Sequence, residues 1–348
     1  MKKQIIKIGI IGAGSIGSLF GAYLAKMGYF RNQLMNAEIS VVLFSRKGHA
    51  IQIKKNGLIL KEQEKVHKIK NIRAFTNPKD FLESETKIEE DSNAKRISFD
   101  FLFLTTKTYD IKSAINEYQD LINRSNWLVV LQNGIGNEEI IKNMMPQVKM
   151  IRMVTTNGAL LEKPGFVTHT GDGTTKMGIS SFTESNPKDL KDLKNLKTLL
   201  ETAGLKSIIV EDIVKECWGK IFVNIGINAF GALTQLNNGD LLKLKGLKNL
   251  MKKAIEEAQY IARKKNIEVK ERDFITLTYD VARKTANNKN SMLQDIQKGN
   301  RTEIDFINGK IVSYAEELGV EVPVNKTLTY LIKGVEFSNQ KKISELKD

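Results

Sequence analysis

The stretch IIKIGIIGAGSIG, residues 5–17, decides the fold of the N-terminal part of this chain. Its first half, 5–11, is a short apolar run rich in β-branched residues, which is typical of a buried strand. GAGSIG at 12–17 then predicts a tight turn, and the apolar periodicity of 18–28 predicts a helix. The chain therefore begins with strand, turn and helix in immediate succession.

The glycines of this turn fit the GxGxxG pattern of a dinucleotide-binding site. Gly12 permits the tight turn, Gly14 lets the backbone approach a pyrophosphate, and Gly17 lets helix and strand pack closely. The N-terminus of the helix offers free N–H groups and a partial positive charge to the phosphates. The pattern alone is weak evidence, but its place between strand and helix favours a dinucleotide over a structural turn. The expected cofactor contacts are Gly12, Ala13, Gly14, Ser15, Ile16 and Gly17.

Further apolar runs alternate with helical patterns through the first half of the chain, which favours an open parallel sheet. The segment 165–179, with several glycines and threonines, predicts antiparallel strands at the edge of that sheet. The segment 83–96 is highly charged and lacks periodicity, so we expect an exposed insertion there. The additional parallel strands are expected at 39–44, 99–104, 127–131 and 149–155.

The character of the sequence changes after Pro187 to long helical patterns, and from about Asp212 onward the chain is expected to be all-helical. The fold class is therefore α/β, with a Rossmann-type dinucleotide-binding domain followed by an all-helical second domain. We expect the first domain at 1–211 and the second, which would bind substrate, at 212–348. The helices are expected at 188–203, 215–232, 245–265, 273–285 and 301–318.

The end of the second strand distinguishes the two common dinucleotides. An NAD site usually places Asp or Glu there to bind the ribose 2′-hydroxyl, whereas an NADP site needs cations for the 2′-phosphate. Here the sequence is VVLFSRKGH, with Ser45, Arg46 and Lys47 in place of the acid. The planar guanidinium of Arg46 can hold a phosphate through several donors. The sequence predicts NADP(H), with Lys47 as a solvated neighbour.

Two polar residues follow other buried strands, where ligands of such sheets collect. Lys107 lies in LTTKT, 104–108, and Asn133 lies in LQNGIG, 131–136. On sequence alone, a solvated loop lysine and a turn-forming asparagine are the better explanations of these two residues.

The stretch GKIFVNIGIN, 219–228, is mostly apolar but carries three polar residues at a spacing of four: Lys220, Asn224 and Asn228. Residues four apart in a helix are rotated by about 40°, so these three form one stripe. A solvated face would usually also carry carboxylates or further lysines, and none occurs at 221–235. Because burying an unpaired lysine is costly, the stripe is expected to line a wet or ligand-filled cleft.

Composition argues against several classes of function. The net charge is +14, but the lysines are scattered and form no arginine-rich stripe, so we expect no nucleic-acid partner, while small anionic ligands remain compatible. No apolar run approaches the ~18 residues that span a bilayer. The single cysteine, Cys217, rules out an intrachain disulfide and fits a reducing cytosol. We therefore expect a cytoplasmic protein without a membrane partner, and we identify no metal site.

If the chain uses a nicotinamide cofactor to reduce a ketone, one of its groups must donate a proton to the oxygen as hydride arrives at the carbon. Histidine is the usual choice, but none of His49, His67 and His169 lies in a convincing pattern. A partly buried lysine can serve as the acid or as a stabiliser of the developing alkoxide. Lys220 is the expected proton donor.

At this point the sequence resembles the ketopantoate reductase (2-dehydropantoate 2-reductase) family. The resemblance rests on GAGSIG, LTTK, QNGIG, WGKIFVNIGIN and SMLQDIQKGNRTEIDFINGK, which occur in this order over most of the chain. The last two stretches are far more specific than the glycine pattern. Insertions relative to the family are expected near 30–37 and 83–96.

The resemblance implies roles for matching residues. Lys220 would donate the proton, Asn224 and Asn228 would bind substrate, and Lys107 and Asn133 would contact the cofactor, with Asn133 also near the substrate. Glu303 would reach the cofactor and organise the site, although without the resemblance it would be a surface glutamate paired with Arg301 or Lys310. Ala159 matches a backbone contact to the nicotinamide more loosely. The remaining implied substrate contacts are Asn238 (or its neighbour Asn237), Ser291, which would bind the carboxylate and follows Asn290 where a second serine is frequent, and Asn288.

The function implied by the resemblance is reduction of 2-dehydropantoate to (R)-pantoate with NADPH, on the way to pantothenate and coenzyme A. Two alternatives remain open at this stage. One is reduction of a different 2-oxo acid on the same scaffold, because a fold does not fix a substrate. The other is a non-enzymatic NADP(H)-binding protein. We also expect a homodimer.

Overall fold

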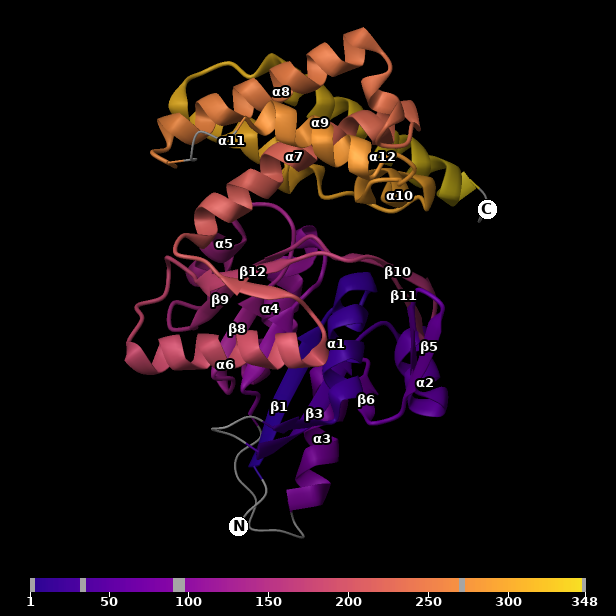
Figure 1. The fold of residues 1–348 in the computed structure, drawn as a ribbon, viewed down its shortest axis with the longest axis vertical. Helices are drawn as coiled ribbons and strands as arrows, with labels where there is room; N and C mark the ends of the chain where they lie inside the picture. The colour runs from indigo at the N-terminus through magenta and orange to yellow at the C-terminus, as the bar shows by residue number, and fades with distance from the viewer. Residues whose placement is uncertain (1–3, 32–35, 90–97, 269–272, 346–348) are drawn as a thin grey trace. The chain divides into compact units, whose positions relative to one another are not determined.

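The computed structural model describes residues 4–31, 36–89, 98–268 and 273–345. The chain divides into two compact units (Figure 1). Unit 1 comprises Met1–Gln132 and Asn137–Ile213, and unit 2 comprises Val214–Asp348 together with the short segment Asn133–Gly136. The sequence-based boundary at 211/212 lies two residues before this division, and it did not include the return of 133–136 to the second unit.

The main sheet of unit 1 has the expected parallel centre. The first strand, β1 (Gln4–Ile11), pairs in parallel with β3 (Asn36–Phe44) on one side and β7 (Phe101–Leu104) on the other, and β8 (Trp127–Val130) and β9 (Met150–Thr155) continue the parallel order. The strand order is β13-β12-β9-β8-β7-β1-β3-β2, and β6 also pairs with β3. The remaining strands of this sheet are β2 (Tyr29–Arg31), β6 (Ile72–Phe75), β12 (Thr175–Ile179) and β13 (Ser207–Ile209).

Alternate residues of each strand point to opposite sides of the sheet. Because consecutive residues of the central strands are apolar, both faces of the sheet are apolar. Ile10 and Phe103 belong to one core cluster, whereas Ile11 and Leu104 belong to the other. Helices therefore cover both faces, as in a doubly wound sheet. The helices of unit 1 are α1 (Ser15–Met27), α2 (Lys47–Asn56), α3 (Pro78–Glu89), α4 (Ile111–Asn123), α5 (Asn137–Met144) and α6 (Pro187–Ala203).

The segment expected as an exposed insertion, 83–96, begins as a helix. Residues 83–89 belong to helix α3, and residues 90–97 lie outside the described ranges. The helix is anchored by Phe81, whose ring packs edge-on against Phe44 at 5.6 Å and stacks on Phe99 at 5.3 Å. A buried aromatic side chain thus anchors a helix that carries many charged residues.

A second, four-stranded sheet in unit 1 was not predicted from the sequence. Its order is β10-β11-β4-β5, formed by β10 (Gly158–Lys163), β11 (Phe166–Gly171), β4 (Leu58–Glu62) and β5 (Lys65–Ile69). The expected antiparallel strands at 165–179 therefore separate. β12 does lie in the main sheet, antiparallel to β9, but β11 pairs with β10 and β4 in the second sheet.

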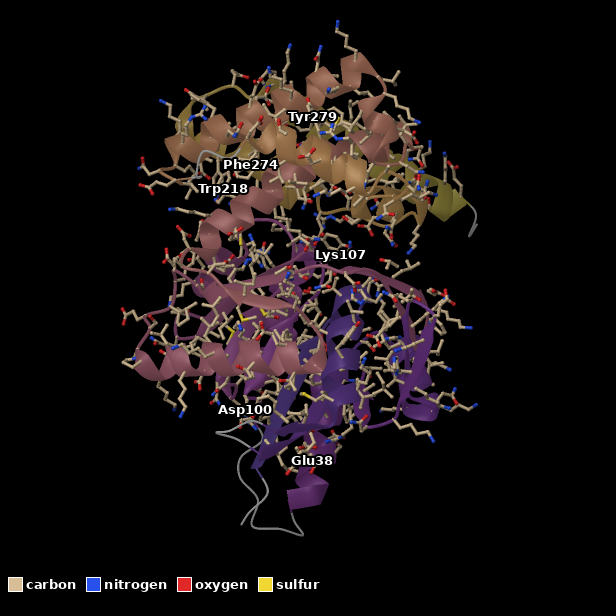
Figure 2. All side chains as sticks on the ribbon, in the orientation of Figure 1. Glu38, Asp100, Lys107, Trp218, Phe274 and Tyr279 are labelled. Carbon is tan, nitrogen blue, oxygen red and sulfur yellow. The ribbon has the colours of Figure 1, made fainter. Side chains whose placement is uncertain are left out.

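Unit 2 contains helices and no strand among its described residues. Phe222 on helix α7 (Ile213–Thr234) packs against Trp218 at 5.9 Å and against Phe274 at 4.8 Å between ring centroids. Trp218 and Phe274 are labelled in Figure 2. The segment expected as one helix at 301–318 is divided into η3 (Ile304–Phe306) and α11 (Asn308–Leu318). The other elements are η2 (Asp240–Leu242), α8 (Lys245–Lys264), α9 (Phe274–Lys284), α10 (Ser291–Gln297) and α12 (Pro323–Glu345).

None of the helices formed by the described residues combines the length and the apolar character needed to cross a membrane.

Candidate functional site

The glycine turn after β1 has the geometry that a dinucleotide requires. Gly12 has a φ of +80°, and a Cβ on it would lie 2.5 Å from Thr106 Cγ2. A Cβ on Gly17 would overlap Thr105 Oγ1, so only glycine allows α1 to approach the sheet this closely. In contrast, the nearest atom to a Cβ on Gly14 would be the Gly12 carbonyl oxygen, 3.9 Å away. The backbone at Gly14 is thus open to a pyrophosphate.

Neighbouring strands hold this turn in place. The N–H groups of Gly12 and Ala13 both donate to the Phe44 carbonyl, at 3.0 and 2.9 Å. The Thr105 hydroxyl lies 3.0 Å from the Ile11 carbonyl and 2.9 Å from that of Gly12. The first turn of α1 carries no acidic residue, so nothing there opposes an anion at the helix N-terminus. These features fit a bound dinucleotide phosphate.

The end of β3 presents cations, as expected. Arg46 and Lys47 are exposed at the start of α2, whose first turn has no acidic residue. The hydroxyl oxygen of Ser45 is buried and has no hydrogen-bond partner among the described residues.

Lys107 and Ala159 also lie in unit 1. Lys107 is partly buried just before the short helix η1 (Thr108–Asp110), beside Thr106, whose carbonyl accepts a hydrogen bond of 2.9 Å from Gln132 Nε2. Ala159 lies in β10, opposite His169 of β11. Their contacts to a cofactor remain predictions.

In unit 2, Lys220, Asn133 and Glu303 form a continuous hydrogen-bonded chain. Lys220 Nζ, on α7, donates to Asn133 Oδ1 at 2.7 Å. Asn133 Nδ2 donates to Glu303 Oε2 at 3.1 Å, and Glu303 itself is only 6 % exposed. Residues that are remote in the sequence therefore converge on one lysine ammonium.

The backbone of 133–136 secures Asn133 in this chain. Ile135 N donates to the Phe306 carbonyl at 3.3 Å. Gly134 has a φ of +82°, and a Cβ on it would lie 2.8 Å from the Phe306 carbonyl oxygen. Arg301, which the sequence offered as a partner for Glu303, donates to Asp305 at 3.2 Å. Glu303 accepts from the Asn133 amide, and its role in the site stays a prediction.

The polar stripe on α7 is only partly accessible. Lys220 and Asn224 are half-buried, and Asn228 is 5 % exposed. On another face of this helix, a Cβ on Gly226 would lie 2.7 Å from Thr278 Cγ2 and 2.9 Å from Ile255 Cδ1. Close packing against α8 and α9 thus fixes the orientation of the stripe.

Asn238 is held with its amide in a defined orientation. Its Nδ2 donates to Thr285 Oγ1 at 2.9 Å, and the Thr285 hydroxyl donates onward to the Val281 carbonyl at 2.8 Å. The Asn238 oxygen Oδ1 is buried and accepts no hydrogen bond from the described residues. Asn238 therefore presents an acceptor, whereas the adjacent Asn237 is partly exposed and its carbonyl accepts from Asp240 N.

Ser291 and Asn288 are exposed at the start of α10 and in the loop before it. Asn290 between them is 8 % exposed and accepts from Leu293 N at 2.9 Å, which caps α10. The carbonyl of Asn288 accepts from Asn238 N at 3.0 Å, which joins this loop to the turn that carries Asn238. The structure thus groups two of the expected substrate contacts by backbone pairing.

Sequence reasoning set aside one residue that the structure places beside the glycine turn. His49 is buried within hydrogen-bonding distance of Ser18 and of Gly165, which lies 116 residues further along the chain. Nothing in the local sequence indicates so remote a partner. Among the described residues, no group of three or more His, Cys, Asp or Glu side chains is placed to hold a metal ion.

Comparisons with known proteins show the family of the chain. Ketopantoate reductase PanE/ApbA matches residues 8–181, and the C-terminal region of the same family matches residues 212–336. The 2-dehydropantoate 2-reductase of Pyrococcus horikoshii is 36% identical over 332 residues, which cover 95% of this chain and 98% of that protein.

Solved structures show the same fold. A PanE/ApbA family ketopantoate reductase from Ralstonia eutropha JMP134 superposes with a TM-score of 0.80 at 26% identity, covering 96% of this chain and 100% of that one. A ternary complex of D-mandelate dehydrogenase with NADH and anilino(oxo)acetate gives 0.81 at 26% identity, covering 96% and 99%. The chain is an oxidoreductase of the ketopantoate reductase family.

Proposed function

We propose that this chain reduces 2-dehydropantoate to (R)-pantoate with NADPH as the hydride donor. The observation that carries the proposal is the chain Lys220–Asn133–Glu303, which supplies an oriented proton donor in a protein of this family. The relative from Pyrococcus horikoshii, named for this activity, matches nearly the whole chain.

The chemistry needs one hydride and one proton. NADPH, when bound, supplies the hydride to the C2 carbonyl carbon of the substrate. Lys220 then donates a proton from Nζ to the carbonyl oxygen, whose developing negative charge the ammonium also stabilises. The neutral amine that remains regains its proton from solvent.

Asn133 and Glu303 direct the ammonium. A carboxylate can only accept hydrogen bonds, so Glu303 fixes which end of the Asn133 amide carries the donor. The amide oxygen must then face Lys220, where it accepts at 2.7 Å. One N–H bond of the lysine is thereby fixed, which limits the directions in which the other two can point.

The polar groups on and near α7 suit a small hydroxylated acid. Asn224 and Asn228 continue the stripe that begins at Lys220, and each amide offers both donors and an acceptor. The open acceptor of Asn238 suits a substrate hydroxyl, because only a donor can satisfy it. Ser291, exposed at the start of α10, would bind the carboxylate.

NADPH is favoured over NADH by the end of β3. Arg46 and Lys47 stand where an NAD site would carry an acid, and the Ser45 hydroxyl beside them has no partner among the described residues. A 2′-phosphate would satisfy both cations and the hydroxyl.

A second candidate function is reduction of a different 2-oxo acid. It is favoured by the likeness to D-mandelate dehydrogenase, which was solved with NADH and anilino(oxo)acetate. A purely nucleotide-binding role is less well supported, because it would not need the three-residue chain around Lys220.

The test is to follow NADPH absorbance with a panel of 2-oxo acids that includes 2-dehydropantoate, its analogue without the hydroxyl group, and phenylglyoxylate. We expect the highest kcat/KM for 2-dehydropantoate. A preference for phenylglyoxylate would support the second function instead, and NADPH binding without turnover of any acid would leave only the binding role.

A further inference from the structure

We propose that His49 is a positioning residue, which holds the glycine turn in its nucleotide-binding conformation through a buried relay of hydrogen bonds. The relay runs from the Gly165 N–H through His49 and the Ser18 hydroxyl to the Ala13 carbonyl. The inference rests on the proposed function only in that the turn binds NADPH.

The directions of the three hydrogen bonds are mutually consistent. Gly165 N–H donates to His49 Nδ1 at 2.8 Å, so this nitrogen carries no proton and the imidazole hydrogen of the neutral ring lies on Nε2. His49 Nε2 is 3.0 Å from Ser18 Oγ and donates to it. The Ser18 hydroxyl hydrogen then remains for the Ala13 carbonyl at 3.1 Å. Every donor and acceptor along the relay is used once.

The relay is almost completely shielded from water. Ser18 is 0 %, Ala13 3 % and His49 5 % exposed. Burial lowers the pKa of the His49 imidazole, which favours the neutral ring that the relay requires. Hydrogen bonds in such surroundings are electrostatically stronger than in water, and an unpaired member is correspondingly costly.

His49 also joins three segments that the proposed cofactor site depends on. Its own helix, α2, begins directly after Arg46, and His49 N donates to the Arg46 carbonyl at 3.0 Å. Ala13 lies within the glycine turn, between Gly12 and Gly14. Gly165 connects β10 to β11, and its φ of +77° favours glycine. One imidazole therefore sets the expected pyrophosphate turn relative to the helix that presents the expected 2′-phosphate ligand.

A second contact ties the same elements together. Ser15 Oγ, in the first turn of α1, accepts from Leu161 N of β10 at 3.1 Å. The turn would therefore keep its general place without His49. What the relay adds is the orientation of the Ala13 peptide, which determines where the neighbouring N–H groups point.

Two partial replacements separate the halves of the relay. In His49→Gln, the side-chain Nε2 can still donate to Ser18, but the acceptor for Gly165 is lost. In His49→Asn, Oδ1 can still accept from Gly165, but the donor to Ser18 is lost. Ser18→Ala removes the link to Ala13 directly. Ser207→Ala is the matched control, because Ser207 is 1 % exposed in the same unit and its hydroxyl likewise donates to a backbone carbonyl, that of Leu205, at 2.9 Å.

The experiment measures NADPH affinity by fluorescence titration without substrate, and kcat at saturating NADPH. We expect His49→Asn and Ser18→Ala to weaken NADPH binding about three- to tenfold, in line with the loss of one buried hydrogen bond, with kcat unchanged. His49→Gln and Ser207→Ala should bind NADPH within about twofold of the unchanged protein.

Equal NADPH affinity in all four variants would overturn the inference, as would a loss of affinity in Ser207→Ala equal to that in Ser18→Ala. If His49→Asn does not fold, the comparison of Ser18→Ala with Ser207→Ala decides alone. Failure of the unchanged protein to bind NADPH would refute the proposed function instead, so the two failures can be told apart.

Discussion

Lys220 and Asn133, 87 positions apart in the sequence, are joined by a hydrogen bond of 2.7 Å from the ammonium to the amide oxygen. Asn133 lies three residues after the end of β8 at Val130, yet it belongs with 134–136 to the helical unit. The segment thus leaves the parallel sheet, contributes one side chain to the environment of Lys220, and returns to the first unit at Asn137.

Replacement of Lys220 by alanine should remove the proton donor and lower kcat by about 10²- to 10⁴-fold, the usual contribution of general acid catalysis. NADPH binding should not change. Lys215→Ala is the matched control, since Lys215 lies on the same helix and pairs with Glu268 at 3.3 Å. Steady-state kinetics and fluorescence titration measure both quantities, and retention of most of the activity in Lys220→Ala would remove the residue from the mechanism.

Glu303 should act through Asn133 rather than independently. Glu303→Gln keeps an oxygen that can accept from Asn133 Nδ2, so it should reduce kcat less than Glu303→Ala does. Because the two residues form one network, the effects of Asn133→Ala and Glu303→Ala should not add, with an interaction energy of about 0.5–3 kcal/mol. A double-mutant cycle on kcat/KM measures this energy, and additive effects would show that the two side chains act separately.

The parallel sheet and the helical second unit could be predicted because their signals are local. The apolar run 99–104 and the glycine turn each indicate their structure within a few residues. Helix α3 was missed because its many charged residues conceal the buried anchor Phe81, which is 2 % exposed. The second sheet was missed because β4 pairs in parallel with β11, more than a hundred residues away, and no local pattern specifies so remote a partner.

The residues of the candidate site also divide into those that a local pattern indicates and those that depend on remote contacts. Residue types at the end of the second strand and along the stripe on α7 pointed to Arg46 and Lys220, and the resemblance to a family added Asn133 and Glu303. What the sequence could not give was that Asn133 lies between Lys220 and Glu303, since this depends on the backbone of 133–136 pairing with Phe306. His49 was set aside because its partners become neighbours only in the folded chain.

Arg46→Ala should change the preference between the two nicotinamide cofactors. Loss of one charge-assisted interaction with a phosphate costs about 1.5–3 kcal/mol, so kcat/KM for NADPH should fall about ten- to a hundredfold. The value for NADH, which lacks the 2′-phosphate, should stay nearly constant. Lys47→Ala, at the next exposed position, should have a smaller effect. An unchanged ratio of NADPH to NADH efficiency in Arg46→Ala would refute the assignment of this residue.

Gly226→Ala should destabilise unit 2, because the added Cβ would lie 2.7 Å from Thr278 Cγ2 and 2.9 Å from Ile255 Cδ1. Overpacking of this kind typically costs about 1–3 kcal/mol. Gly246→Ala is the matched control at the start of α8, where a Cβ would meet nothing within 4 Å. That change should be neutral or stabilising by up to about 1 kcal/mol. Urea unfolding measures both, and equal stability of the two variants would contradict the packing described for α7.

Asp189 should make the stability of the protein depend on acid pH. Burial of this carboxyl opposes its charge, but hydrogen bonds from Lys149 Nζ at 2.9 Å and from Asn186 N at 3.0 Å outweigh it, so the pKa of Asp189 lies below its ordinary value of 3.8. As the pH falls below that ordinary value, the Asp189 carboxylate becomes protonated in the unfolded chain but stays ionised in the folded chain. The stabilisation is therefore complete above the ordinary pKa and is lost as the pH falls through the folded-state pKa.

Asp189→Asn isolates this contribution, because the amide oxygen can still accept from Asn186 N while the charge that Lys149 binds is gone. The variant should have a lower free energy of unfolding than the unchanged protein at neutral pH. This difference in free energy should become smaller at pH values below the ordinary pKa of Asp189. Other carboxylates titrate in both proteins, so the difference between the two free energies of unfolding is the quantity that reports on Asp189. Urea unfolding at a series of pH values measures it. If the difference between the two free energies of unfolding stays constant from neutral to acid pH, Asp189 stabilises the protein through its packing and its hydrogen bond at the start of α6, and not through its charge.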